Sequence, residues 1–305
     1  MTKPAVTLAQ ALENYVVHLR TVAKATSAAT AHWARKQLVR VLGEELLVAE
    51  VGAGAVDRFI ETRKAEGAAT ATINSELRQM RAAVRYCEEC GGVDRAPRVR
   101  LLKEGRKLPT ALSQEQVDRL VRSAPDAATR LAILLAAHAG LRHQEITHLR
   151  RDDVDVKGLV IRVTAKPDIG WSPKSHHERA VPMSKRLSVA LAERLVETRG
   201  PWLFPGRYGR PRVNLHRDVA AAFATARLAD PKLKPGLHLL RRTFASALLT
   251  GGADVETVRE LGGWADLSTV QRYVTSEDRF KRRAIEAVFD GGEQRKWVYE
   301  HTDAE

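Results

Sequence analysis

The 305-residue sequence contains no long hydrophobic run, and this absence excludes one class of protein. No stretch of about 18 apolar residues occurs, so we expect no segment that spans a membrane. The first residues, MTKPAVTLAQALENY, also lack the apolar core and the small-residue cleavage site of a signal peptide. The sequence therefore predicts a cytoplasmic protein with no membrane partner.

Cysteine is scarce, with two residues, Cys87 and Cys90, in a C-x-x-C spacing. A structural zinc ion usually needs four ligands, and no second Cys or Cys/His pair with zinc-finger spacing follows. Both cysteines fall at the end of a helical pattern, about one turn apart. The sequence favours ordinary helix thiols over a metal or redox site, and we expect no metal ion and no cofactor.

Acidic residues are fewer than basic ones, at 37 Asp and Glu against 50 Lys and Arg. The formal net charge is +13, and the sequence pI is about 10.0. A basic surface favours polyanions, because each neutralised phosphate releases a condensed counterion. Basic proteins are common, however, so charge alone leaves nucleic acid binding as one of two open interpretations.

Helical periodicity runs through the first part of the chain, and the predicted helices cover Leu8–Leu19, Ser27–Leu42, Val56–Lys64 and Ala71–Cys87. In the last of these, apolar residues recur at intervals of 4, 3, 4 and 3: Ile73, Leu77, Met80, Val84 and Cys87. An adjoining stripe holds four polar residues: Asn74, Arg78, Arg81 and Arg85. Arginines on a helix face can contact phosphates or read guanine edges, although a solvated basic face would show the same pattern.

A basic segment without periodicity, residues 93–108, reads as an interdomain linker. It predicts a helical domain over residues 1–92 and a second domain over residues 109–305. The second domain should be mostly helical with a small sheet, because Leu159–Val163 and Ala180–Pro182 resemble strands around a polar loop. Its predicted helices start at Ser113 and cover Ala127–Ala137, Lys185–Thr198, Val219–Leu228, His238–Leu249 and Val255–Leu261.

Four short motifs in the second domain carry candidate chemistry: AGLRHQEITHLR (139–150), PKSHHERAVP (173–182), HLLRRTFASALL (238–249) and ELGGWADLSTVQRY (260–273). The first places Arg142 just after a helix-ending glycine, and the third places His238 and Arg241 on one face of a helix start. Each residue alone has an ordinary interpretation, such as a surface arginine, a capping pair or a packed tyrosine. Function can be inferred only from their combination.

Taken in order, these motifs closely resemble those of the tyrosine recombinases, the phage-integrase family. Gly140–Glu145 matches the family pattern T-G-[LM]-R-x-x-E, and His238–Ala245 matches H-x-L-R-H-[TS]-F-A. The stretch from Leu261 to Tyr273 matches L-G-H-x-x-[IL]-x-T-T-x-x-Y. The resemblance implies a mainly α protein with a helical, SAM-like core-binding N-terminal domain. It also implies a mixed α/β catalytic domain with a small antiparallel sheet.

The resemblance implies catalytic roles for six residues: Arg142, Lys174, His238, Arg241, Trp264 and Tyr273. Tyr273 would be the nucleophile that forms a 3′-phosphotyrosyl link, and Glu145 would support the arginines. Trp264 replaces the family's second histidine, and its indole N–H can donate a hydrogen bond but cannot accept a proton. Because hairpin loops vary in length, Lys166 remains an alternative to Lys174.

The resemblance further implies a site-specific recombinase that works without metal or ATP on double-stranded DNA with inverted half-sites. It would act as a homo-oligomer, a dimer on each site and a tetramer in the synapse. An apolar stripe that begins at Phe280 would dock into a neighbouring protomer. A type IB-like topoisomerase and a non-catalytic DNA-binding relative are the alternatives.

Overall fold

The computed structural model describes residues 5–23, 25–104, 110–174, 177–230 and 233–273. The chain forms two compact units, residues 1–106 and 107–305, and each is described by itself. We call them the N-terminal unit and the C-terminal unit. Among the described residues, no helix combines the length and the hydropathy needed to cross a bilayer.

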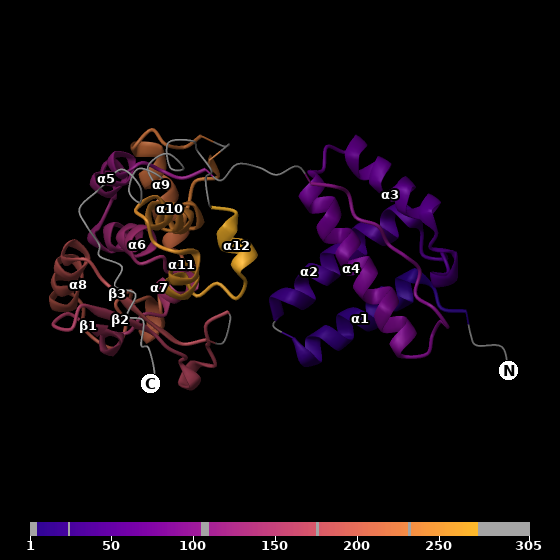
Figure 1. The fold of residues 1–305 in the computed structure, drawn as a ribbon. Coiled ribbons are helices and arrows are strands. Elements are labelled where there is room, and N and C mark those ends of the chain that lie inside the picture. The colour runs from indigo at the N-terminus through magenta and orange to yellow at the C-terminus, as the bar shows by residue number, and fades with distance from the viewer. Residues whose placement is uncertain (1–4, 24, 105–109, 175–176, 231–232, 274–305) are drawn as a thin grey trace, which may run out of the picture. The chain divides into compact units, whose positions relative to one another are not determined.

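The N-terminal unit is a bundle of four helices, α1 (Leu8–Val22), α2 (Ala25–Leu42), α3 (Ala53–Ala65) and α4 (Thr70–Glu89). In Figure 1, α4 crosses α1 and α2, and it packs against both. The apolar stripe predicted on α4 is buried, with Ile73, Leu77, Met80 and Val84 fully inaccessible. Burial of this stripe against α1 and α2 is what holds the bundle together.

The segment predicted as a linker packs largely on the N-terminal unit. Val99 lies in the core of the unit and is 2% exposed. Asn74 holds the segment in place, because its side-chain oxygen accepts from the backbone N–H of Leu102 at 2.8 Å and its amide donates to the Leu102 carbonyl at 3.0 Å. The guanidinium of Arg81 donates to the carbonyl of Val99. Residues 93–104, which we call the crossing segment, therefore pack on this unit before the chain enters the C-terminal unit.

The same contacts correct one expectation. Asn74 was predicted to lie on a DNA-contacting stripe, but it is 1% exposed and its amide is used inside the fold. On the same stripe, Arg78 is more than half exposed and forms a 3.6 Å ion pair with Glu104. Arg85 is exposed. Arg78 and Arg85 thus face outward, while Asn74 and Arg81 face the segment that crosses the stripe.

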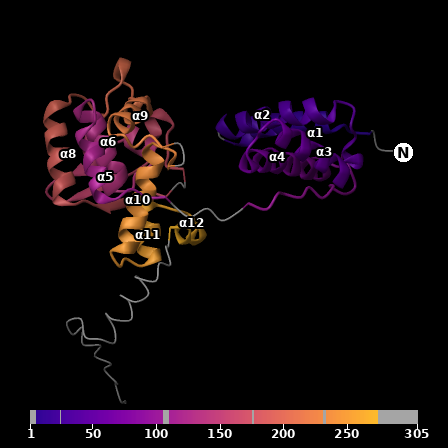
Figure 2. The same ribbon diagram turned by 90° about the horizontal axis from the view of Figure 1, so that it is seen from above.

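The C-terminal unit is built around α6 (Ala127–His138), which is buried on nearly all sides. It packs against α5 (Gln114–Arg122), α8 (Lys185–Glu197), α9 (Leu215–Thr225) and α10 (Leu237–Thr250). Figure 2 shows these helices grouped together, with α11 (Val255–Gly262) and α12 (Leu267–Gln271) beyond the end of α10. A short helix, α7 (His143–Thr147), follows α6.

A three-stranded antiparallel sheet of order β1-β2-β3 completes the C-terminal unit. Its strands are β1 (Val154–Asp155), β2 (Val160–Val163) and β3 (Arg179–Pro182), with Ile161 opposite Val181. Short 3₁₀ turns cover Val48–Glu50, Arg151–Asp153, Pro167–Ile169 and Arg207–Gly209. The mainly helical class with a small antiparallel sheet is confirmed. The predicted apolar helix after Tyr273 lies outside the described residues.

Replacement of Asn74 by alanine should release the crossing segment, because the backbone groups of Leu102 would lose their partners. An unsatisfied buried polar group costs about 1–3 kcal/mol, which corresponds to about five- to 150-fold faster hydrogen exchange of residues 99–104. Exchange followed by mass spectrometry measures this directly. The matched control is Asn14→Ala on the exposed face of α1, which should leave exchange in this segment unchanged. Equal exchange in both variants would contradict the assigned role.

Candidate active site

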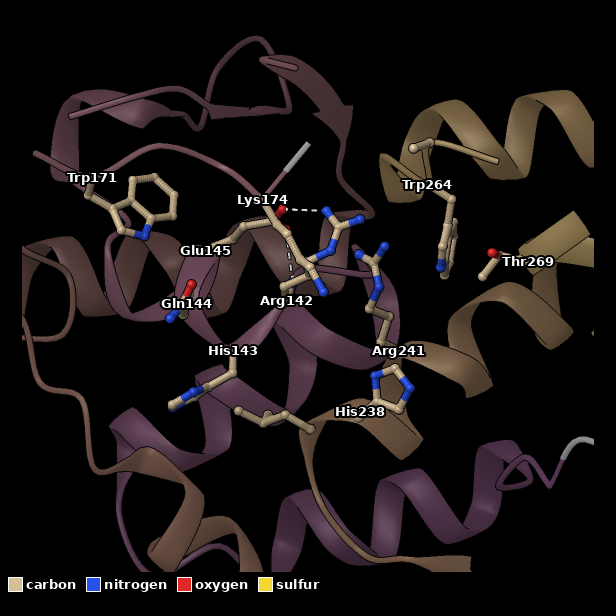
Figure 3. A pocket seen from close by; sticks show the side chains of 12 residues that line it. Arg142, His143, Gln144, Glu145, Trp171, Lys174, His238, Arg241, Trp264 and Thr269 are labelled. Atoms are coloured by element: carbon tan, nitrogen blue, oxygen red, sulfur yellow. Dashed lines mark hydrogen bonds and ion pairs between the residues drawn. The ribbon is translucent and has the colours of Figure 1, made fainter. Parts of the chain in front are cut away.

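A pocket of about 540 Å³ in the C-terminal unit gathers most of the residues predicted to carry chemistry. Six of the seven predicted residues line it: Arg142, Glu145, Lys174, His238, Arg241 and Trp264. Figure 3 shows the two arginines side by side near the centre, with Trp264 on one side and Trp171 on the other. These residues come from α7, α10, the β2–β3 loop and the turn after α11, so segments up to 122 residues apart in sequence meet here.

A glycine turn sets the position of Arg142. Gly140 has a φ of +63°, and a Cβ there would lie 2.4 Å from the ring of Phe244. The turn ends α6 and makes Arg142 the N-cap of α7, where its backbone N–H donates to Glu145 Oε2 at 2.8 Å. Its side chain also donates to Glu145 Oε1 at 2.7 Å. Glycine is required here because a side chain would meet both strained backbone and an aromatic ring.

Glu145 is a buried anion, 2% exposed, among the cations of the pocket. Burial alone would raise the pKa of its carboxyl group. The hydrogen bonds and positive charge of Arg179, together with Arg142, outweigh burial and lower this pKa to about 2. The carboxylate is therefore charged throughout the physiological range.

Arg241 is 2% exposed and stays in place through carbonyl groups and an aromatic face. Its guanidinium donates to the carbonyls of Gly140 and Gly262, and it lies 4.0 Å from the centre of the Trp264 ring. Burial, and next the positive charge of Arg142, lower the pKa of Arg241 to about 9. The group remains a cation at neutral pH.

Trp264 and Tyr273 pack in a small separate core beside the pocket. Both are 7% exposed, and their ring centres are 5.9 Å apart at an angle of 52°. Tyr273 does not line the pocket, unlike the other predicted residues. It follows α12, and its backbone N–H donates to the carbonyl of Val270. The phenol is thus held against Trp264, which in turn covers Arg241.

His238 lies in the first turn of α10 with its ring exposed to the pocket. Partial loss of hydration lowers the pKa of its imidazole, and nearby cations, including Arg242, Arg241 and Lys174, lower it further. The lowered pKa favours the neutral form of the ring. A neutral imidazole can accept a proton.

The two candidate lysines have different surroundings. Lys174 is exposed and lines the pocket. Lys166 is 4% exposed, and its ammonium group donates to Asp153 at 2.8 Å and to the hydroxyl and carbonyl oxygens of Thr164 at 2.6 and 3.1 Å. These three contacts use all three ammonium protons. Lys166 thus points into the fold, and of the two lysines Lys174 is the one that lines the pocket.

Sequence reasoning did not identify Arg179, which pairs with Glu145 from β3. The available signal was its place in the motif E-R-A-V-P, in a strand whose alternate residue Val181 is buried. On the N-terminal unit, a second hollow of about 660 Å³ collects basic residues. They come from α4 and the crossing segment: Arg81, Arg85, Arg95, Arg98 and Arg100.

The pocket is suited to a phosphate ester, because fixed guanidinium groups, an ammonium and N–H donors converge on one space. Residues 110–279, more than half of the chain, match the family model described as "Phage integrase family". The chain therefore belongs to the phage integrase family, a family of site-specific recombinases.

Individual relatives agree with this assignment. The chain is 29% identical over 253 residues to tyrosine recombinase XerA of Thermococcus kodakarensis, covering 75% of this chain and 79% of the relative. Among solved structures, the Tn1549 transposon integrase in complex with transposon right end DNA has a TM-score of 0.75 at 19% identity, covering 92% of this chain and 99% of that chain. The recombinase XerH bound to palindromic difH DNA has a TM-score of 0.69 at 20% identity, covering 94% and 86%. The structural likeness shows the same fold.

Replacement of Gly262 by alanine should disorder the pocket without unfolding the unit. A Cβ at this position would lie 1.8 Å from Cζ3 of Trp264, so the indole must move away from Arg241. A misplacement of about 1 Å can cost about 100-fold in rate, so we expect at least that loss in recombination activity.

The matched control is Gly54→Ala, a helix glycine in α3 with nothing within 4 Å of its added Cβ. That change should keep activity and stabilise the fold by about 0.4–1 kcal/mol. Full activity of the Gly262→Ala variant would contradict the importance of the indole position.

Proposed function

We propose that the chain cuts and rejoins DNA at specific sites through a covalent 3′-phosphotyrosyl link to Tyr273. The observation that carries this proposal is the convergence of Arg142 and Arg241 on one pocket, with a phenol one side chain away. A phosphodiester is anionic, and its transition state spreads further charge over the nonbridging oxygens. Fixed cations aimed at those oxygens lower the barrier without rearrangement during the reaction.

The proposed first step forms a bond between the Tyr273 oxygen and phosphorus and breaks the bond from phosphorus to the 5′ oxygen. Arg142 and Arg241 grip the nonbridging oxygens, and the indole N–H of Trp264 donates to the same phosphate. His238, neutral because of its lowered pKa, accepts the phenol proton. Lys174 delivers a proton to the departing 5′ oxygen.

The covalent intermediate conserves the energy of the phosphodiester bond, so rejoining needs no ATP. In the reverse step, a 5′ hydroxyl attacks the phosphotyrosine, and the phenol leaves. Attack by the 5′ end of a different strand gives recombination, while attack by the original end restores the starting DNA. The described residues offer no group of three or more side chains suited to hold a metal ion. The positive charge in the proposed step comes from the chain's own cations.

The proposed DNA partner is supported by the basic hollow on the N-terminal unit, where Arg81 and Arg85 of α4 lie beside Arg95 and Arg98. Such a surface binds the phosphate backbone and releases counterions. We further propose that one protomer binds each half of an inverted site, so that two occupy a site and four form the synapse. The palindromic DNA in the XerH complex is consistent with two-fold pairing on one site.

The central test uses nicked suicide duplexes of randomised sequence, which trap a covalent adduct because the short cleaved strand diffuses away. The wild-type chain should become attached to a selectable set of sequences, and Tyr273→Phe should bind them equally but never attach. Tyr208→Phe is the matched control, because Tyr208 is an almost fully exposed tyrosine of the same unit. Attachment of the Tyr273→Phe variant would refute the proposal. Exchange products from paired selected sites distinguish a recombinase from a topoisomerase.

Lys174→Met should slow cleavage of ordinary DNA by about 100- to 10,000-fold, the usual contribution of a positioned general acid. Sulfur in place of the bridging 5′ oxygen should restore the rate, because a thiol with a pKa near 8.5 leaves as the anion without a proton. Single-turnover cleavage of both DNAs measures this. Lys157→Met, at an exposed lysine between β1 and β2, should cleave both at the wild-type rate. Rescue of Lys166→Met but not of Lys174→Met would identify Lys166 as the acid instead.

A further inference from the structure

Arg179, at the start of β3, is a nearly buried arginine that connects the small sheet to the pocket. Its side chain is 8% exposed. Its two terminal nitrogens donate to the two oxygens of Glu145 at 3.1 and 2.8 Å, and its Nε donates to the carbonyl of Leu261 at 2.9 Å. Burial of a charge in this way is costly unless the partners are well placed, so the geometry is specific.

The Glu145 carboxylate accepts hydrogen bonds from both Arg179 and Arg142, and all of its acceptor sites are occupied. Oε1 accepts from the side chains of both arginines, at 2.7 Å from Arg142 and 3.1 Å from Arg179. Oε2 accepts from the backbone of Arg142 and the side chain of Arg179, both at 2.8 Å. A carboxylate has about four acceptor sites. With all four filled, the carboxylate has a single orientation, which fixes the side chain of Arg142 shown beside it in Figure 3.

Arg179 also supports the turn that follows α11. A Cβ at Gly263, where φ is +62°, would lie 2.8 Å from the guanidinium of Arg179, so the turn backbone lies directly on this side chain. The carbonyl of Gly262 accepts from Arg241, and the carbonyl of Gly263 accepts from Arg142. The turn that rests on Arg179 therefore positions both arginines of the proposed phosphate site.

We propose that Arg179 is a positioning residue for DNA cleavage, which sets Arg142 through Glu145 and sets Arg241 and Trp264 through the Leu261–Gly263 turn. The inference rests on the proposed function. Among the described residues that line the pocket, Arg179 is absent, so it acts through its neighbours rather than by touching the phosphate. It also connects the strand that follows the Lys174 loop to the rest of the site.

This role has a signature in the pH dependence. The charged groups that face Glu145 are Arg142 from its own helix, Arg179 from β3 and Arg241 from α10. Without Arg179, burial raises the pKa of Glu145, and protonation then frees Arg142. A carboxylate whose lowered pKa has been raised loses its function as pH falls through the new value. The wild-type rate should be insensitive to Glu145 down to a pH near its pKa of about 2, so the variant should lose activity at a higher pH.

The experiment compares Arg179→Met and Arg179→Lys with Arg162→Met, an exposed arginine of the neighbouring strand β2. Single-turnover cleavage rates and DNA affinities are measured on one selected suicide duplex across pH. Arg179→Met should cleave about 100-fold more slowly with little change in affinity, and its rate should fall further as pH decreases. Arg179→Lys keeps a charge near Glu145 but cannot reach both oxygens and Leu261. It should restore the wild-type pH profile without the full rate.

The control variant should match the wild-type chain in rate, affinity and pH profile. A wild-type rate and pH profile for Arg179→Met would overturn the proposal. So would a slow rate for Arg179→Lys together with a pH profile shifted as far as that of Arg179→Met. If Arg179→Met does not fold, the Arg179→Lys profile and the double variant Arg179→Met/Glu145→Gln, which removes the unpaired charge, decide the question. Covalent attachment of the wild-type chain to DNA distinguishes failure of the proposed function from failure of the Arg179 proposal. If the wild-type chain does not attach, the proposed function is refuted. If it attaches and the Arg179 variants are unaffected, only the role of Arg179 is refuted.

Discussion

The candidate active site depends on a buried anion that holds like charges together. Arg142, Arg179 and Arg241 lie close enough that the positive charge of the first two lowers the pKa of the third. Without a compensating anion, the three guanidinium groups would move apart, because repulsion between like charges is strong where water is excluded. Glu145 offsets this repulsion with four hydrogen bonds from two of the arginines. The carboxylate keeps its negative charge in spite of burial, so it holds the cation cluster together.

Backbone carbonyls provide the rest of the compensation, and glycine makes them available. The carbonyls of Gly140, Gly262 and Gly263 accept hydrogen bonds from Arg142 or Arg241. A side chain at any of these positions would collide with Phe244, Trp264 or Arg179 respectively. The glycines of the motifs G-L-R and L-G-G-W thus let the backbone lie close to the arginine and aromatic side chains, and this matters as much as the functional side chains of the same motifs. Polar groups of the main chain carry no net charge, so they orient the guanidiniums without neutralising them.

Sequence patterns predicted what depends on local periodicity and missed what depends on distant partners. The α4 stripe was predictable because helical burial repeats every three or four residues. Strand β1 has two residues, too few to show an alternation. Asn74 shares the periodicity of the α4 arginines, yet its partner lies 28 residues away in an extended segment without any repeat. Arg179 was missed for the same reason, since its contact with Glu145 spans 34 residues.

Trp264 connects two parts of the unit that pack separately. The main core surrounds α6, whereas a smaller cluster joins Phe244, Val258, Val270 and Tyr273 to Trp264. One indole covers Arg241 at 4.0 Å and also contacts the Tyr273 ring. The family pattern has histidine at this position. Its smaller imidazole would offer less area for the contacts with Arg241 and Tyr273 and would fill less of the space next to Gly262. An indole cannot accept a proton but gains this contact area, so Trp264 connects the buried cation Arg241 to Tyr273, and in the proposed mechanism the proton acceptor is His238.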